Sequence, residues 1–386
     1  MNKTFFIIWA DPKFYQTLIF LSKKINTKNN KVIIISRNTK NTEDIIKKVN
    51  FGRNVEILNN PLLINNSLNL INYICFMLYV FFNFIKHNPS SVIFFNKKAL
   101  FTAYLIKFIK RNTIFIYHNF DYDLKKNIKN IKVKTLIFLE KYISKFCDIL
   151  VFPSFERGKI FRNETQNFSS KIYTFMNCFP KNFKVKKRRN FKKFLKIKNL
   201  NNKKIICHLG SIGPHHHIEN IIESFKYVKK NIILIIAGKS NGNFSKYLQK
   251  KIIRNKAENN IFILEDVSND YWFDILHNSN LGLCFYENIN LSHKYMAGTS
   301  QKFNNYLCFN IPMIVNDNFD FKKFNKNRNI YEMINPKNTK RLANKINYVL
   351  KNNSRTMKIK KNMKMVFNNE LNFERQYDLS YGKFLS

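Results

Sequence analysis

The chain has 386 residues, of which 45% are hydrophobic, and a formal net charge of +43. This length is too great for one ordinary hydrophobic core and predicts two domains, and the hydrophobic content excludes an intrinsically disordered chain. The basic residues are mostly lysines, spread through the chain among asparagine, isoleucine and 39 phenylalanine residues. We attribute most of the charge to this compositional bias, although so positive a field would also attract phosphate-bearing ligands and an anionic membrane surface.

The first apolar run, residues 4–9, is cut off by Asp11 and Pro12 and is too short for a signal peptide, so we interpret it as a β-strand. Runs rich in Ile, Val and Phe alternate with helical stretches such as 132–146, which predicts a parallel sheet covered by helices. The strands predicted in the first half are residues 4–9, 31–37, 55–58, 91–95, 113–117, 148–152 and 171–175.

Residues 68–85 (LNLINYICFMLYVFFNFI) are long and apolar enough to be considered for a transmembrane helix. Asn69, Asn72 and Asn83 interrupt the run, so we predict a buried helix between two strands. A helix that lies in the membrane interface is the intermediate alternative.

His118 follows the predicted strand 113–117, with Asp121 and Asp123 close behind it. Side chains at the carboxyl end of a parallel strand can face a ligand cleft. The local sequence fits a solvent-exposed, capped loop equally well. No glycine-rich fingerprint follows the first strand, so we expect no dinucleotide in the first half.

Residues 181–204 consist almost entirely of Lys, Arg, Asn and Phe and predict an interdomain linker. Aromatic residues between charges also occur in nucleic-acid-binding arms, but we do not expect nucleic acid as the partner. We place the domains at 1–180 and 204–366, the linker at 181–203 and a C-terminal helix at 367–386. The second half predicts strands at 205–209, 232–237, 261–264, 281–285 and 311–315, and helices at 218–229, 338–350 and 357–385.

Two polar loops follow strands of the second half. The first contains Gly210 and Ser211 and runs on to His215, His216 and His217; the second contains Gly238 and Lys239. Glycines allow a ligand to approach the backbone closely. Adjacent histidines rarely converge on one ion and no acidic residue or cysteine stands beside them, so we expect no metal.

Residues 298–315 (GTSQKFNNYLCFNIPMIV) predict a helix with Thr299 or Ser300 as its N-cap, a turn closed by Asn310, and a buried strand. The N-terminus of a helix has free N–H groups and a partial positive charge, which suits an anion. Lys302 adds a full charge in the first turn, with Gln301 beside it and Asn305 and Tyr306 one turn later. This order suits a nucleotide diphosphate and its ribose.

Together these segments resemble the two-domain GT-B glycosyltransferases, and most of all glycosyltransferase family 4, the group 1 type. The segment 300–315 is similar to the family motif s-x-K-x-x-E-Y-x-x-x-G-x-P-x-V, with matches at Lys302, Tyr306 and Pro312. Residues 209–214 (LGSIGP) resemble its phosphate-binding loop, and 235–239 (IIAGK) its next strand and glycine turn.

Four positions depart from the family pattern. Asn305 stands where a glutamate commonly binds the ribose, and Ala297 occupies the earlier glutamate position. Asn310 replaces a glycine, which is tolerable because Asn also enters the left-handed region. His216 aligns where many relatives carry Arg or Lys, and a histidine is charged less reliably near neutral pH.

The resemblance implies two Rossmann-like α/β domains that face a cleft, with the C-terminal helix returning to the first domain. It implies a nucleotide-sugar donor on the second domain, a glycan or lipid-linked acceptor on the first, and retention of anomeric configuration without metal or cofactor. It places the enzyme in cell-surface polysaccharide or glycolipid synthesis, in the cytoplasm or peripherally on the inner face of the plasma membrane.

The resemblance also implies roles for the candidate residues. Negative charge develops on the diphosphate as the sugar leaves, and preorganised donors stabilise it. We expect this from Lys302, His216, the amides at Ser300 and Gln301, and Gly210 and Ser211. Gly238, Lys239 and Tyr306 would also bind the donor, Asn305 would hold the ribose, and His118 would contact the donor sugar.

Two other classes remain open. A nucleotide-sugar epimerase on the same fold would turn over the donor without an acceptor. A non-enzymatic basic protein would bind nucleic acid or membrane with steep salt dependence. The six scattered cysteines predict reduced thiols.

Overall fold

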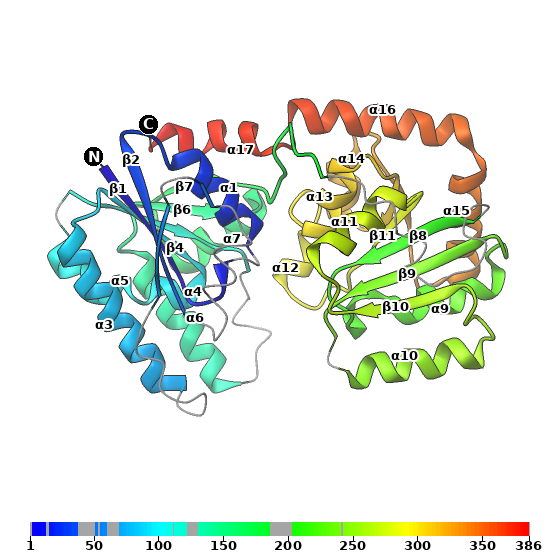
Figure 1. Ribbon diagram of the computed structural model, residues 1–386, viewed down its shortest axis with the longest axis horizontal. Helices are drawn as coiled ribbons and strands as arrows, with labels where there is room; N and C mark the ends of the chain where they lie inside the picture. Colours follow the sequence, from blue (N-terminus) through cyan, green and yellow to red (C-terminus); the bar gives the residue numbers. More distant parts are fainter. Residues whose placement is uncertain are drawn as a thin grey trace. The chain divides into compact units, whose positions relative to one another are not determined.

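The computed structural model describes residues 2–12, 15–37, 51–52, 55–59, 69–110, 112–121, 130–185, 203–240 and 242–385. The chain forms two compact units (Figure 1). Unit 1 consists of Met1–Asn177, Asn290–Ser292 and Gln376–Ser386, and unit 2 of Cys178–Ile289 and His293–Arg375. Asp123 and most of the predicted linker, residues 186–202, lie outside the described residues.

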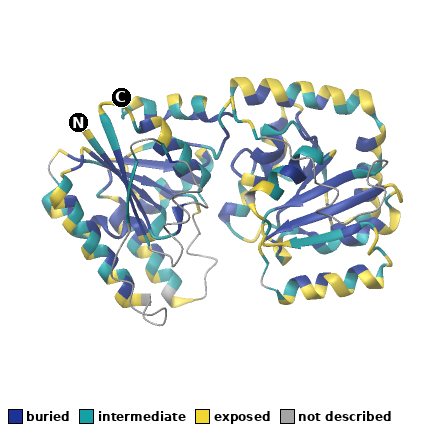
Figure 2. Cartoon of the chain, in the orientation of Figure 1, coloured by how far each residue is buried: buried dark blue, intermediate teal, exposed yellow. Residues whose placement is uncertain are grey.

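Unit 1 is built on a parallel sheet with the strand order β3-β2-β1-β4-β5-β6-β7. Every strand predicted in the first half is present. The strands inside the sheet carry side chains without exposed surface, such as Phe5, Ile33 and Phe94, so the middle of the sheet is covered on both faces, whereas its two edge strands are only partly buried (Figure 2). The strands are β1 (Asn2–Ile8), β2 (Asn30–Ser36), β3 (Glu56–Asn59), β4 (Ser91–Phe95), β5 (Ile114–His118), β6 (Ile149–Phe152) and β7 (Lys171–Thr174).

The helices of the first half connect these strands. They are α1 (Gln16–Ile25), α3 (Asn69–His87), α4 (Asn96–Leu100), α5 (Ala103–Ile106), the 3-10 helix η2 (Lys107–Ile109), α6 (Ile131–Ser144) and α7 (Phe155–Thr165). Within the described residues, α3 alone is long and apolar enough to cross a membrane, over Leu70–His87. The prediction that this helix is buried is wrong for its outer face, because α3 belongs to an outer layer and only one of its sides packs on the sheet.

Unit 2 has a six-stranded parallel sheet of order β10-β9-β8-β11-β12-β13. The strands are β8 (Lys204–Leu209), β9 (Ile232–Gly238), β10 (Ile261–Glu265), β11 (Leu281–Cys284), β12 (Met313–Asn316) and β13 (Glu332–Ile334). The predicted strand at 311–315 begins two residues later, after Pro312. The three-residue β13 at the sheet edge was not predicted, because so short a strand leaves little periodic signal.

Helices lie on both sides of this sheet (Figure 1). They are η5 (Pro214–His216), α9 (Ile218–Ser224), η6 (Phe225–Tyr227), α10 (Asn243–Arg254), α11 (Asn269–Asn278), α13 (Gln301–Cys308), α14 (Phe319–Asn325), α15 (Thr339–Lys351) and α16 (Asn353–Asn369). Two more, α12 (Leu291–Lys294) and α17 (Phe373–Leu379), have residues in both units. The chain ends in η7 (Tyr381–Lys383).

The helix predicted over 357–385 is broken into α16, α17 and η7, and Asn372 accounts for the first break. Its side-chain amide donates to the carbonyl of Phe367 at 2.8 Å, and its Oδ1 accepts from the Arg375 N–H at 2.9 Å. One asparagine therefore ends α16 and caps α17. From Gln376 onward the chain belongs to unit 1.

Strands β8 and β11 mark the point where the strand order of unit 2 reverses. They pair only at Leu281–Ile206 and Gly282–Cys207. Beyond this pairing the buried Tyr306 hydroxyl accepts from the Leu209 N–H at 3.2 Å and donates to the Cys207 carbonyl at 3.0 Å. The hydroxyl satisfies backbone groups that the diverging strands leave unpaired. In open parallel sheets, this reversal point is where ligands bind.

Gly282 is the position that admits the Tyr306 ring, because a Cβ there would lie 2.5 Å from the ring. We expect Gly282→Ala to lower the free energy of unfolding of unit 2 by about 1–3 kcal/mol, the usual cost of overpacking. Gly213→Ala is the matched control, since its Cβ would meet nothing closer than 3.8 Å. Urea unfolding followed by Trp272 fluorescence in a Trp9→Phe background measures both. Equal stabilities of the two variants would contradict this packing.

Candidate active site

The helix expected to carry the site begins as predicted. Ser300 is the N-cap of α13, and its hydroxyl accepts from the Phe303 N–H at 3.3 Å. Asn310 follows the helix in the left-handed conformation, with φ of 52°. Lys302 therefore lies in the first turn, and its side chain runs toward the end of β8.

Lys302 is a buried cation, with 4% of its surface exposed. Its Nζ lies 3.1 Å from Nε2 of His208 and 4.8 Å from the ring centroid of Tyr286. No carboxylate among the described residues forms an ion pair with it. Burial lowers the pKa of Lys302 to about 8. A buried charge without a counter-ion is costly, so the site is complementary to an anion.

Two neutral histidines surround this lysine. Burial and the nearby Lys302 charge lower the pKa of His208 well below its usual value and that of His216 to about 3. A neutral imidazole nitrogen can accept a hydrogen bond from the ammonium group. The Nδ1 atoms of His208 and His216 are buried and have no hydrogen-bond partner. His216 therefore contributes no positive charge to this site.

The two glycine loops pack against each other beside Lys302. Gly210 has φ of 137°, and a Cβ there would lie 3.2 Å from Cε of Lys302. Gly238 has φ of 154°, and a Cβ there would lie 1.7 Å from the Gly210 carbonyl oxygen. Neither position admits a side chain, so the loop backbone is open to a ligand. Ser211 and Lys239 are exposed at their rim.

These loops line an open pocket of about 530 Å³. Trp272 of α11 forms a further wall. Volumes of this size are typical of small-molecule sites. The lining residues are Gly210, Ser211, Ile212, Gly213, Gly238, Lys239, Ser240 and Trp272, all of unit 2. Gly210 is shared between the pocket and the surroundings of Lys302, so both belong to one site.

Several predicted donor-binding residues instead make contacts within the protein. The Ser300 N–H donates to the Met296 carbonyl at 3.2 Å, so this amide is already occupied. Asn305 is 1% exposed and its Oδ1 accepts from Gln301 Nε2 at 3.3 Å. Tyr306 bridges β8 and β11 and has no exposed surface. For these residues the contacts support a role in holding α13, and ribose binding by Asn305 stays a prediction.

The three consecutive histidines turn to different partners. His215 Nδ1 lies 3.2 Å from a carboxylate oxygen of Glu287, and His217 Nδ1 lies 3.3 Å from Oδ1 of Asn220. His216 packs edge-on against Tyr286, with ring centroids 5.3 Å apart. Only His216 therefore reaches the surroundings of Lys302.

His118 lies at the end of β5 in unit 1, inside an aromatic cluster. The imidazole has no exposed surface, and its Nδ1 lies 2.6 Å from the Tyr381 hydroxyl. Burial lowers its pKa to about 3, and its Nε2 has no hydrogen-bond partner. Contact between His118 and a donor sugar stays a prediction.

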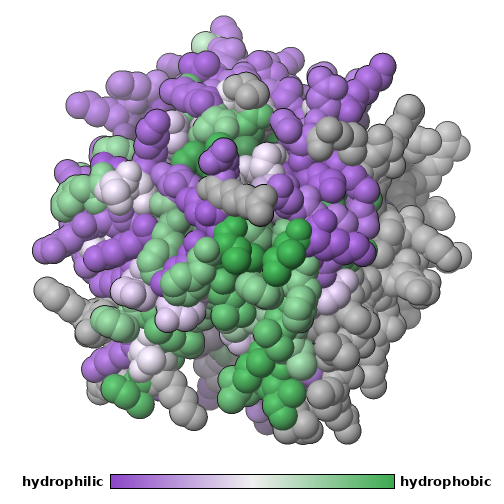
Figure 3. Space-filling model, turned by 90° about the vertical axis from the view of Figure 1, so that its left-hand side faces the viewer, coloured by the Kyte–Doolittle hydropathy of each residue, from purple (hydrophilic) through white to green (hydrophobic). Residues whose placement is uncertain are grey.

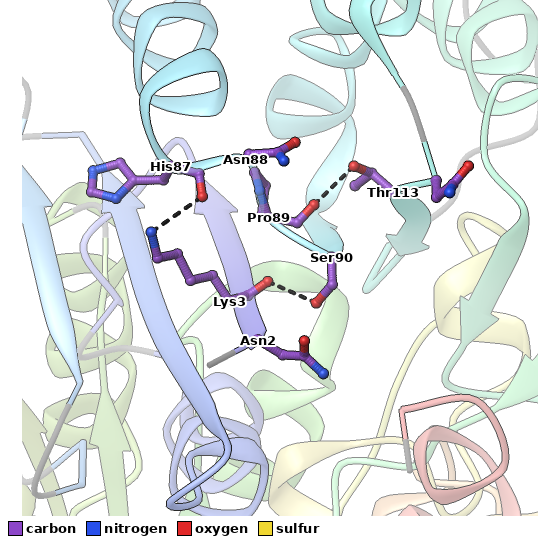
Figure 4. Close-up of a pocket in the computed structure, with 8 residues that line it drawn as sticks. Asn2, Lys3, His87, Asn88, Pro89, Ser90 and Thr113 are labelled. Atoms are coloured by element: carbon purple, nitrogen blue, oxygen red, sulfur yellow. Dashed lines mark hydrogen bonds between the residues drawn. The ribbon is translucent and has the colours of Figure 1, made fainter.

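A second pocket of about 410 Å³ lies in unit 1 (Figure 4). It lies at the amino ends of β1, β4 and β5, the edge opposite to the one where ligands of parallel sheets bind. Its polar groups bond one another: Lys3 Nζ donates to the His87 carbonyl at 3.3 Å, and Thr113 donates to the Pro89 carbonyl at 2.8 Å. We do not assign a ligand to it.

Sequence reasoning missed His208, Tyr286 and Trp272. His208 is the fifth residue of the buried strand β8, where a lone polar residue among aliphatic ones was the available signal. Tyr286 follows β11, and its hydroxyl bonds that of Ser300. Trp272 is one of two tryptophans in the chain, and only its place beside the glycine loops distinguishes it.

The lowered pKa of Lys302 predicts how unit 2 responds to pH. The unfolded chain holds this proton up to about pH 10.4, whereas the folded protein releases it from about pH 8. The charged lysine therefore destabilises the fold below pH 8, and this penalty disappears as pH rises toward 10. We expect Lys302→Met to be more stable than wild type at pH 7 by about 1–3 kcal/mol, with a difference that shrinks by pH 10. Urea unfolding of both proteins at several pH values measures it; a variant that is less stable at pH 7 would refute the buried-charge account.

The comparisons with known proteins agree with this fold. Residues 190–366 match the family model of glycosyl transferases group 1. A search of curated protein sequences finds no relative of the chain.

Solved structures match over nearly the whole chain. HepE from Anabaena, in complex with UDP and glucose, is 13% identical, with a TM-score of 0.77 and 99% of each chain covered. Sucrose-phosphate synthase from Thermosynechococcus elongatus is 12% identical, with a TM-score of 0.73 and coverage of 99% and 98%. WaaG, a glycosyltransferase involved in lipopolysaccharide biosynthesis, is 10% identical, with a TM-score of 0.66 and coverage of 98% and 99%. The chain thus has the fold of GT-B glycosyltransferases, and its residues 190–366 match the model of the group 1 glycosyltransferase family.

Proposed function

We propose that this protein transfers a hexosyl group from a nucleotide-sugar donor to a glycan or lipid-linked acceptor. One observation carries the proposal: the buried Lys302 ammonium has no carboxylate partner in the part of the chain that the structure describes, and it lies beside the glycine loops at the reversal point of the unit 2 sheet. A diphosphate supplies the missing negative charge. HepE, which shares the fold, was solved with UDP-glucose.

The reaction needs the charge that Lys302 provides. When the bond between the anomeric carbon and the diphosphate breaks, negative charge builds on the leaving oxygen. A preorganised cation at that oxygen lowers the barrier more than it stabilises the bound donor. His208 holds the ammonium group in place by accepting one of its hydrogen bonds, and the His216 ring and the Gly210 backbone line the same space.

The nucleoside would occupy the pocket beside Trp272. Gly210 lines the pocket and also lies beside Lys302. One ligand can therefore place its diphosphate at the lysine and its base at the indole ring of Trp272. Aromatic stacking favours a base without selecting its identity.

The finer features of the proposal rest on the family resemblance. They are retention of anomeric configuration, transfer without a metal ion, and a role in cell-surface polysaccharide or glycolipid synthesis. The WaaG relationship in fold supports a surface-glycan pathway. We place the protein in the cytoplasm, with peripheral contact to the inner face of the plasma membrane.

We expect Lys302→Gln to lower kcat/KM for sugar transfer by about two to three orders of magnitude, as for the loss of one oxyanion donor. Lys246→Gln removes an exposed lysine of the same unit and serves as the matched control. The assay follows release of the nucleoside diphosphate over a panel of nucleotide sugars and acceptors. An unaltered rate for Lys302→Gln would remove the lysine from the mechanism, and donor turnover without an acceptor would favour an epimerase.

Trp272→Ala should weaken the binding of a nucleoside diphosphate by about 5- to 150-fold, the range of one base–aromatic stack. Binding of inorganic pyrophosphate should stay unchanged, because it lacks the base. Trp272→Phe keeps an aromatic face and should retain most of the affinity. Isothermal titration with both ligands separates the two effects; equal losses for both would place the base elsewhere.

A further inference from the structure

Helix α3 presents an apolar face to the surface of unit 1. Its exposed side chains are 41% to 71% accessible and recur at helical spacing. A surface helix of a soluble domain normally carries charged residues on this side. The sector has no charged residue before Lys86 and is formed by Leu70, Ile71, Ile74, Leu78, Phe82 and Ile85.

The opposite side of α3 is anchored in the unit 1 core. Phe76, Val80 and Phe84 are buried, and Trp9 contacts Phe76 with ring centroids 5.0 Å apart. The Tyr73 hydroxyl donates to the Lys98 carbonyl at 2.6 Å. The helix cannot cross a bilayer without leaving the sheet, although its length and composition would suffice. Its apolar face is therefore a surface of the folded unit.

Aromatic residues extend this face beyond α3. Helix α5 packs against α3, and Tyr104 and Phe108 at α5 and η2 are exposed. The Nζ of Lys107 lies 4.2 Å and 4.6 Å from their ring centroids, and 3.8 Å from that of Phe146. The apolar stem of Lys107 thus ends in a cation among aromatic rings. Such a group suits the boundary between the headgroups and the acyl chains of a lipid bilayer.

The charged side chains of α3 and of the segment that follows it have one sign. Residues 69–110 contain five lysines and no acidic residue. Lys97 and Lys110 are engaged by Glu140 and Asp148 from other elements, whereas Lys86 and Lys98 are exposed. Figure 3 shows hydrophobic side chains gathered on this side of the molecule, with hydrophilic ones mainly above them. An apolar surface edged by lysines complements an anionic lipid bilayer.

We propose that the apolar face of α3, together with Tyr104 and Phe108, inserts into the headgroup region of an anionic membrane. Lys86, Lys98 and Lys107 then meet lipid phosphates. This binding deepens the proposed function, since a lipid-linked acceptor would reside in that membrane. Only the biological role of the binding rests on the proposed function. A second copy of this chain fits the face less well, because the same lysines would oppose one another.

The test is co-sedimentation of the full-length protein with phosphatidylcholine vesicles that contain phosphatidylglycerol. We expect Leu78→Glu/Phe82→Glu to lower the partition coefficient at least about tenfold, since charges oppose interfacial insertion. The matched control, Ile253→Glu/Phe319→Glu, places the same charges on exposed apolar positions of unit 2 and should bind as wild type. Vesicles of phosphatidylcholine alone should bind wild type more weakly, because the lysines lose their partners.

A depth measurement keeps the test decisive. The fluorescence of the tryptophan introduced by Leu78→Trp should be quenched by lipids brominated in the upper acyl chain. The circular dichroism spectrum and the UDP affinity of the Leu78→Glu/Phe82→Glu variant should equal those of wild type. Loss of donor binding can then be told apart from loss of vesicle binding by the apolar face of α3. Vesicle binding equal to wild type in this variant would overturn the proposal. So would a wild-type dimer that the variant dissociates, without vesicle binding.

Discussion

The ammonium group of Lys302 is the constraint around which unit 2 is arranged. It is held inside the protein by a neutral histidine and an aromatic ring, without a carboxylate among the described residues. Burying an unpaired charge lowers the free energy of unfolding. The fold alone gains nothing in return. The binding of an anionic ligand would supply the counter-ion that this buried ammonium group lacks. Groups with strongly shifted pKa values of this kind are found at functional sites more often than elsewhere.

The neighbouring structure keeps that space open. Strands β8 and β11 separate after two residue pairs, and the Tyr306 hydroxyl satisfies the backbone that the separation exposes. Gly210 and Gly238 lie so close to Lys302 and to each other that no side chain fits between them. The ligand therefore meets the backbone of the loops, a cation and an indole, the three kinds of group that phosphate and base require. The membrane face of α3 lies in the other unit and depends on none of these contacts.

Much of this could be read from the sequence, for identifiable reasons. Strands such as β4, β6 and β9 are runs rich in Ile, Val, Leu and Phe, and α13 has a Ser cap at one end and a left-handed Asn at the other. Local patterns of this kind specify local structure. The partners of Lys302 could not be predicted, because His208 and Tyr286 lie far from it in the chain and meet it only when β8 and β11 lie side by side. The exposed face of α3 was missed for a similar reason: an apolar helix looks the same whether a second layer covers it or not.

The most direct test of the central claim is the titration of the Lys302 amine by NMR, with lysine labelled at the ε-carbon and the signal assigned through Lys302→Gln. The account predicts that the pKa of Lys302 in the free protein is about 8. Saturating UDP should raise it by at least about one unit, because the diphosphate favours the charged form. A pKa that is unchanged by UDP, or one near that of a solvated lysine in the free protein, would contradict the account.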